Sequence, residues 1–167
     1  MNKDKYIEII SQSRNLIYKV CFSFCTHPED RKDLEQEILV NIWKGLDRFD
    51  GQVKISTWIY KIALNTAISY YRKEKKRGIK VSIDTAVISL SDTSIQDAVY
   101  RENVEYLYRF IGELKEMDKA LILLYLDDIK YAEISRIMGI TETNVATKIS
   151  RIKKQLKEKF EQNKNME

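Results

Sequence analysis

The sequence has one proline among its 167 residues, and no apolar run is long enough to span a membrane. A single proline, together with 32% charged residues, is typical of a helical, soluble protein. The start, MNKDKYIEII, lacks the apolar core of a signal peptide. We therefore expect a cytoplasmic chain that is not inserted in a membrane.

Cysteine and histidine are nearly absent as well. The chain has Cys21 and Cys25, four residues apart on an expected helix, and one histidine, His27, just beyond them. A metal or redox site is conceivable for this trio, but no fourth ligand is evident. Two reduced, largely buried thiols explain the pair better, and we expect no cofactor.

The positive charge is distributed unevenly. The net charge of +4 is only a weak indication of an acidic partner. Because neutralising phosphates releases counterions, separate basic clusters would predict separate contacts with a polyanion. The sequence contains two such clusters, one in its middle and one near its end: Arg72, Lys73, Lys75, Lys76, Arg77 and Lys80, and then Lys148, Arg151, Lys153, Lys154, Lys157 and Lys159.

The first half of the chain shows three helical periods. A helix over residues 3–26 should end at His27, because the residue before a proline disfavours helical dihedrals, and Pro28 can open the next helix. A loop around residues 50–52 precedes a third helix, which Ser56 or Thr57 can cap and Gly78 ends. The second helix carries a predicted apolar stripe, expected to pack on the third helix: Leu34, Ile38, Ile42 and Leu46, widened by Leu39 and Trp43.

The second half predicts a helix-turn-helix. Helices are expected over residues 95–113, where Val99, Phe110 and Ile111 are among the core candidates, and over 117–126, before a turn at 127–128. Residues 131–138 form the first helix of the motif, and Gly139 allows a tight turn. Thr141 caps the following helix, whose buried stripe is Val145, Ile149, Ile152 and Leu156.

Two stretches resemble one protein family. The segments DLEQE, LDRF and TWIYKIALNTAISYYR are similar to conserved region two of bacterial sigma factors of the extracytoplasmic-function (ECF) type. The later stretch YAEISRIMGITETNVATKISRIKKQL resembles region four of the same family. Helix-turn-helix segments are widespread, so the pair, in the expected order and with a plausible spacer, is stronger evidence than either stretch alone.

The resemblance implies an all-α fold of two small helical domains joined by a flexible linker. Region two would occupy residues 1–78, the linker 79–94 and region four 95–163. Such a protein binds core RNA polymerase and directs promoter recognition, DNA melting and transcription initiation. Its expected partners are core polymerase, promoter DNA and an anti-sigma factor, and it is not expected to be an enzyme.

By the same resemblance, three sets of residues receive roles. An acid-rich face of the second helix would dock on a coiled coil of polymerase. The end of the third helix would hold the downstream (−10) element through aromatic and basic side chains, which suit an unpaired strand. The last helix would enter the major groove at the upstream (−35) element. The sets are Asp33, Gln36, Glu37 and Asn41 for polymerase; Lys61, Asn65, Tyr70, Tyr71, Arg72, Lys73 and Lys76 for −10 DNA; and Asn144, Thr147, Lys148, Arg151 and Lys153 for −35 DNA.

Two other functions remain open at this point. A stand-alone helix-turn-helix regulator would read its operator unaided, but that leaves residues 33–77 unexplained. A metal-dependent nuclease would need converging carboxylates, for which Asp33, Glu37, Asp47 and Asp50 are candidates. Asp33 and Glu37 share a helix face, whereas the other two lie turns away near the loop, and no histidine base or phosphate loop accompanies them.

Overall fold

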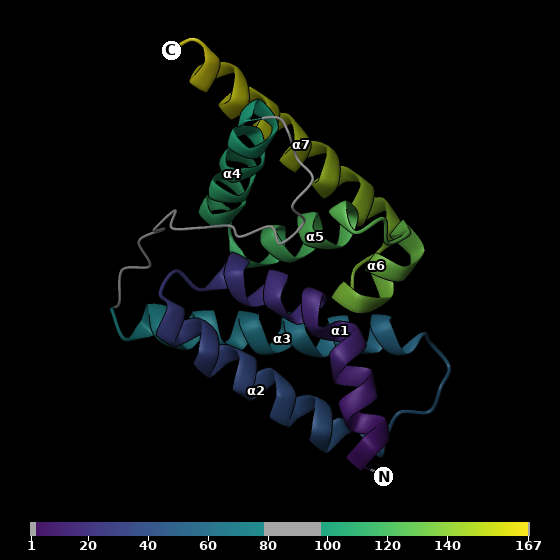
Figure 1. Cartoon of the computed structure of the whole chain (residues 1–167). Helices are drawn as coiled ribbons and strands as arrows, with labels where there is room; N and C mark the ends of the chain where they lie inside the picture. Colours follow the sequence, from purple (N-terminus) through teal and green to yellow (C-terminus); the bar gives the residue numbers. More distant parts are fainter. Residues whose placement is uncertain (1–2, 79–97, 167) are drawn as a thin grey trace.

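The structure is a computed structural model that describes residues 3–78 and 98–166. Within these ranges it contains seven α-helices and no β-strand (Figure 1). The expected all-α fold is therefore confirmed. The linker expected over residues 79–94, and the first residues of the helix expected from 95, lie outside the described residues.

Three helices form the N-terminal lobe: α1 (Lys3–Phe24), α2 (Pro28–Leu46) and α3 (Ile55–Lys76). Pro28 opens α2 as expected, and His27 before it is extended, with φ −85° and ψ 138°. The three helices pack pairwise against one another. The predicted stripe of α2 is confirmed, since all four of its residues are buried: Leu34, Ile38, Ile42 and Leu46.

Four helices form the C-terminal lobe: α4 (Ala98–Glu113), α5 (Glu116–Leu126), α6 (Tyr131–Met138) and α7 (Glu142–Lys164). The bounds expected for the helix-turn-helix, α6 followed by α7, are confirmed. So is its buried stripe on α7: Val145, Ile149, Ile152 and Leu156. The helices of this lobe pack on one another, and α7 is the longest of them.

The predicted cap of α3 is wrong. Lys54 occupies the N-cap position and makes no side-chain cap, and Ser56 is exposed. Thr57 is buried one turn further on, where its hydroxyl donates to Glu133 Oε1 of α6 at 2.5 Å. The hydroxyl that could have capped the helix is therefore used between the lobes.

Two residues expected in the core are instead exposed. Trp43 follows Ile42, so its side chain is rotated by about 100° from the buried line. It is 46% exposed and lies edge-on to Tyr6 of α1, with ring centroids 4.8 Å apart. Val99 is 61% exposed at the start of α4, whose buried residues, Phe110 and Ile111, lie at the opposite end.

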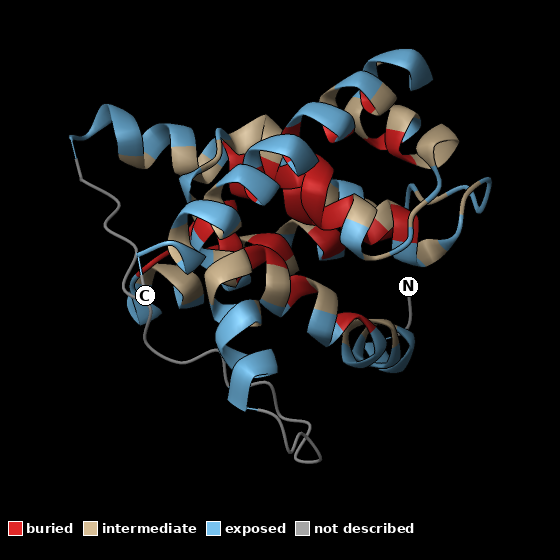
Figure 2. Ribbon diagram, turned by 90° about the horizontal axis from the view of Figure 1, so that it is seen from above, coloured by how far each residue is buried: buried red, intermediate tan, exposed pale blue. Residues whose placement is uncertain are grey.

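The two lobes pack against each other through α5. Figure 1 shows α5 between the N-terminal helices and α7, and α5 contacts α1, α3, α4, α6 and α7. A helix that is covered on all sides is apolar all round, which explains the composition of α5. Burial runs through the centre of the molecule as one continuous cluster (Figure 2). The buried residues of α5 are Lys119, Ala120, Leu121, Ile122, Leu123 and Leu124.

Candidate protein and nucleic-acid interfaces

The outer face of α2 presents the acid-rich set. Asp33 and Gln36 are exposed on the outward side of α2, and Glu37, one turn after Asp33 and next to the buried Ile38, is half-buried. Asn41 differs from them, because its side-chain amide donates to Thr66 Oγ1 of α3 at 3.0 Å. The structure therefore brings the first three residues together on an open surface, while Asn41 links α2 to α3.

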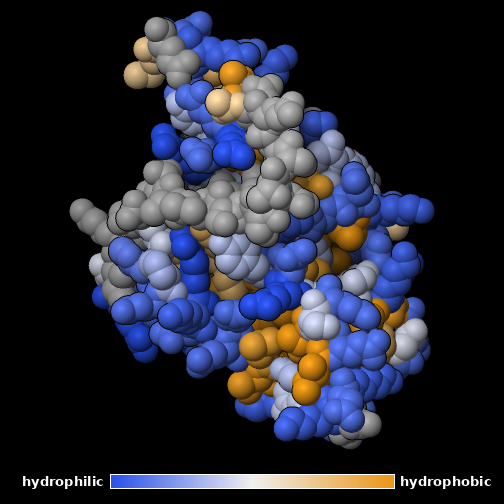
Figure 3. Space-filling model, in the orientation of Figure 1, coloured by the Kyte–Doolittle hydropathy of each residue, from blue (hydrophilic) through white to orange (hydrophobic). Residues whose placement is uncertain are grey.

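The same face continues into exposed apolar surface, which sequence reasoning missed. Val40 is 47% exposed on the line of Asp33 and Glu37. Trp43 lies beside it, and Ile7 of α1 is 54% exposed. Figure 3 shows apolar surface where the N-terminal half of α1 lies beside α2. The sequence did contain a signal for this apolar surface. Val40 lies seven positions, or two helical turns, after Asp33, and that spacing places it on the same face of the helix.

A polar stripe runs along α3. Lys61, Asn65, Arg72 and Lys76 follow one another at spacings of four, seven and four, which places them on one face, and all four are exposed. Lys73 is also exposed, on an adjoining part of the helix. A positively charged row with an amide in its centre is suited to a nucleic-acid strand.

Tyr70 and Tyr71 do not lie on this stripe. Both are half-buried, and burial, together with the nearby acid Asp30, raises the pKa of Tyr70. The ring of Tyr71 lies 4.8 Å from the amine of Lys119, which belongs to α5 of the other lobe. The structure thus separates the two aromatic residues from the exposed row with which they were grouped.

The turn of the helix-turn-helix is set by one backbone conformation and two local hydrogen bonds. Gly139 adopts a left-handed conformation with φ 68°, as the tight turn requires. The hydroxyl of Ser135 donates to the carbonyl oxygen of Ile140 at 2.5 Å. Thr141 caps α7 as predicted, its oxygen accepting from the backbone N–H of Asn144 at 3.1 Å. These contacts fix the angle at which the start of α7 leaves the turn.

The exposed side of α7 carries most of the predicted groove-binding set. Asn144, Thr147 and Arg151 are exposed there and Lys148 is half-buried. Arg151 also pairs with Asp118 of α5, with 3.2 Å between nitrogen and oxygen. Lys153 lies about two and a half turns after Asn144, on the opposite side, and its amine lies 3.2 Å from the hydroxyl of Tyr125. Lys153 therefore does not share the face of the others.

The nuclease candidates are not brought together. Among the described residues, no group of three or more histidine, cysteine, aspartate or glutamate side chains is arranged to hold a metal ion, so Asp33, Glu37, Asp47 and Asp50 form no such centre. Cys21 and Cys25 are buried free thiols, and burial raises the pKa of each to about 12. No described helix combines the length and apolar character needed to cross a bilayer.

Comparison with known families gives two matches along the chain. The family described as Sigma-70 region 2 matches residues 9–77, and the one described as Sigma-70, region 4 matches residues 105–156. The first covers the N-terminal lobe and the second covers α5, α6 and most of the helices on either side of them. The two matches follow one another along the chain in the expected order.

Curated relatives match most of the chain. The chain is 29% identical to the ECF RNA polymerase sigma factor SigM of Bacillus subtilis, over 96% of this chain and 98% of that protein. It is 28% identical to the ECF RNA polymerase sigma-E factor of Escherichia coli, over 79% of this chain and 74% of that protein.

Solved structures share the fold. The sigma factor RpoE from Bartonella quintana, solved in complex with the anti-sigma factor NepR, matches with a TM-score of 0.74 at 18% identity, over 94% of this chain and 96% of that chain. CnrH, solved in complex with the cytosolic domain of CnrY, matches with a TM-score of 0.68 at 18% identity, over 96% of this chain and 90% of that one.

Proposed function

This chain belongs to the sigma-70 family, as an ECF-type RNA polymerase sigma factor, and we propose which of its surfaces carry out the family's function. A sigma factor binds core RNA polymerase and directs promoter recognition and transcription initiation; it is not an enzyme. The observation that carries this conclusion is the pair of family matches, in order, on one chain. A stand-alone regulator would not need the first of them.

The polymerase-binding surface is the outer face of α2. Asp33, Gln36 and Glu37 supply polar contacts there, and Val40 adds exposed apolar area next to them. Protein interfaces combine such an apolar centre with a polar rim. Asn41 acts indirectly, because its hydrogen bond to Thr66 holds α2 in register on α3.

The −10 element binds along α3. The row of Lys61, Asn65, Arg72 and Lys76, with Lys73 beside it, neutralises the phosphates of the unpaired strand, while the Asn65 amide reads a base edge. Tyr70 and Tyr71 border this surface and supply aromatic rings once the strand reaches the end of the helix.

The −35 element binds the exposed side of α7. Asn144, Thr147, Lys148 and Arg151 enter the major groove, and Lys153, on the opposite side, makes at most a contact with the phosphate backbone. Because the chain works on polymerase and promoter DNA, we place its activity in the cytoplasm. By analogy with the partners named for the two solved relatives, an anti-sigma factor regulates it.

A polymerase-binding assay tests the first of these surfaces. Alanine at both Asp33 and Glu37 should weaken association with core polymerase about tenfold, because it removes two charged contacts from this surface. Glu35→Ala is the matched control, since Glu35 is an exposed acid of the same helix that points to another side. Equal affinity of the double variant and the control would refute the assignment.

A further inference from the structure

We propose that Thr147 recognises a thymine of the −35 element through its γ-methyl group, which contacts the C5-methyl group of that base. The proposal rests on the groove-binding role given to α7 above. It adds the chemical feature that one residue of this face reads, and so the base that the face selects at one position.

Thr147 lies in the centre of the groove-binding face of α7. It is exposed, and it comes three residues after Asn144 and four before Arg151, so both are its neighbours on the helix surface. The helix begins at Glu142, which places Thr147 in the second turn. In helix-turn-helix proteins the N-terminal part of the second helix reaches the base edges. Thr147 is therefore placed where a base is read.

The hydroxyl proton of Thr147 is already used within the helix. Its Oγ1 donates to the backbone carbonyl oxygen of Thr143, one turn earlier, at 3.0 Å. Because threonine is branched at Cβ, its hydroxyl and its γ-methyl group leave that carbon in different directions. The hydrogen bond turns the hydroxyl toward the helix backbone, and the γ-methyl is the group left to contact a ligand. Thr147 thus offers a base an apolar group and no hydroxyl proton.

Among the four bases, thymine carries the matching group. In the major groove it presents a C5-methyl group beside its O4 acceptor, whereas cytosine has only a hydrogen at C5. Contact between the two methyl groups removes apolar surface of both from water. Ala146, the preceding residue, ends in a methyl group as well, so its side chain brings no donor or acceptor that would favour another base. The chemistry at this point of α7 therefore selects thymine.

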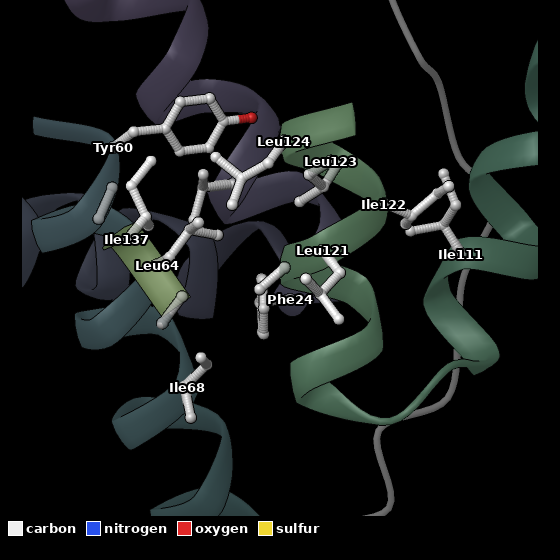
Figure 4. Close-up of a cluster of buried hydrophobic side chains, with 14 of the residues drawn as sticks. Phe24, Tyr60, Leu64, Ile68, Ile111, Leu121, Ile122, Leu123, Leu124 and Ile137 are labelled. Atoms are coloured by element: carbon white, nitrogen blue, oxygen red, sulfur yellow. The ribbon is translucent and has the colours of Figure 1, made fainter. Parts of the chain in front are cut away.

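The packing beneath α7 fixes the position of Thr147. The opposite side of the helix is the buried stripe that contains Val145 and Ile149, and α7 contacts both α5 and α6. Those two helices are themselves packed, since Figure 4 shows Leu121 of α5 and Ile137 of α6 in one buried cluster. A contact between methyl groups needs such a fixed position, because dispersion attraction acts only at close approach.

Replacing thymine by deoxyuridine tests the contact, because it removes the C5-methyl group and keeps the base pairing. The probe is a duplex with the −35 element of a promoter identified by reconstituted transcription from a genomic fragment library. Each thymine of the element, on either strand, is replaced in turn, and holoenzyme binding is measured by filter binding. At one thymine the replacement should weaken binding by the wild type about fourfold, the effect of one methyl group that is no longer buried.

Two substitutions at Thr147 separate its methyl group from its hydroxyl. Thr147→Ser loses the methyl, so it should bind the thymine probe about fourfold more weakly than the wild type and should bind both probes equally. Thr147→Val keeps a methyl and loses the hydroxyl, and it should distinguish the two probes as the wild type does. Lys148→Ala is the control, because the loss of a phosphate contact should weaken binding to both probes by the same factor. Circular dichroism checks that the variants keep their helices.

Two results would overturn the proposal. The first is weak binding by Thr147→Val together with normal binding by Thr147→Ser, which would mean that the hydroxyl oxygen accepts a hydrogen bond from a base. The second is a deoxyuridine effect that is absent at every thymine, or that is equally large in the wild type and in Thr147→Ser. Thr147 would then contact no thymine methyl group.

The proposed −35 role of α7 fails in a different way. If Lys148→Ala leaves the affinity unchanged and no deoxyuridine affects binding, α7 does not enter the groove. If Lys148→Ala weakens binding while Thr147→Ser distinguishes the probes as the wild type does, the groove role stands and the methyl contact does not exist.

Discussion

Lys119 has chemical properties that come from the fold around it. It is a lysine on a short apolar helix, yet it is almost completely buried, between rings of α1 and α3. Burial lowers the pKa of its amine from 10.5 to about 8, while Cys25 and Glu116 act in the opposite direction. Glu116 also accepts a hydrogen bond from Arg72. Because its pKa differs between the folded and the unfolded chain, Lys119 makes the stability of the protein depend on pH.

Stability should rise with pH where Lys119 loses its proton. Below a pH of about 8 the amine is charged in both the folded and unfolded chain, and between about 8 and 10.5 the unfolded chain binds more protons. Relative to Lys119→Met, the wild type should gain about 1 kcal/mol between about pH 8 and about pH 9. Urea denaturation of both proteins measures the free energy of unfolding at each pH. The tyrosines and thiols are present in both proteins, so their contribution drops out of the difference. A pH-independent difference would contradict it.

Asn65 should act in opening the promoter. It is exposed in the middle of the α3 row, and an amide reads a base edge through paired donor and acceptor atoms that alanine lacks. A base must leave the duplex before it can be read in this way. Asn65→Ala should therefore keep polymerase binding and closed-complex formation while reducing open complexes roughly tenfold.

Reconstituted transcription from a genomic fragment library first identifies a promoter that the protein uses. Permanganate footprinting on that promoter then measures the fraction of open complexes. A premelted bubble template should restore much of the lost activity. Ser69→Ala, four residues along the same exposed face, is the control and should open the duplex normally. Full opening by Asn65→Ala would show that Asn65 is only a surface residue.

At the scale of elements, the basic residues of α7 lie on two sides of the helix. Arg151 and Lys148 lie on the side that we propose enters the groove, and Arg151 also pairs with Asp118. Lys153 lies against Tyr125 on the other side, with its amine 5.2 Å from the ring centroid. The basic cluster seen in the sequence is thus divided between two surfaces by the helical period.

The two sides should differ in their salt dependence. Each phosphate contact that is lost flattens the plot of log affinity against log salt by about one unit. Lys148→Ala and Arg151→Ala should each do so in holoenzyme binding to a −35 duplex, whereas Lys153→Ala should change the slope by less than about half a unit. Filter binding over a range of salt concentrations measures the three slopes. The same change for all three variants would place Lys153 on the groove side after all.

At the scale of the whole molecule, the lobes share one interior. The buried cluster continues from α1 and α3 through α5 to α7, and α5 has no solvent-facing side over much of its length. Neither lobe buries its own apolar surface completely without the other. We therefore expect the described helices to unfold together.

Two probes test that cooperativity. The chain has two tryptophans, Trp43 and Trp58, and both lie in the N-terminal lobe, so their fluorescence reports that lobe alone. Circular dichroism reports the helices of both. The two urea transitions should coincide in the wild type, and Leu124→Ala, at a fully buried position of α5, should shift both by about 2–4 kcal/mol. A second circular-dichroism step without a fluorescence change would show that the lobes unfold separately.

The sequence by itself determined the helices and the family. Helical period, Pro28, Gly139 and the Thr141 cap are local signals, and they located the start of α2, the end of α6 and the start of α7. The two family segments were recognisable for the same reason, because each keeps its motif within one continuous stretch of chain. The assignment of sites to the outer faces of α2, α3 and α7 followed from that resemblance and from spacing.

Only the tertiary structure decided how the lobes meet. Helical period shows that a face is apolar or polar, but it does not show what covers that face. Thr57 was expected as a cap and bonds Glu133 instead, Trp43 was expected inside and lies at an exposed edge, and Lys119 gave no sign of burial. Each of these outcomes depends on contacts between residues far apart in sequence, and local propensity carries no information about such contacts.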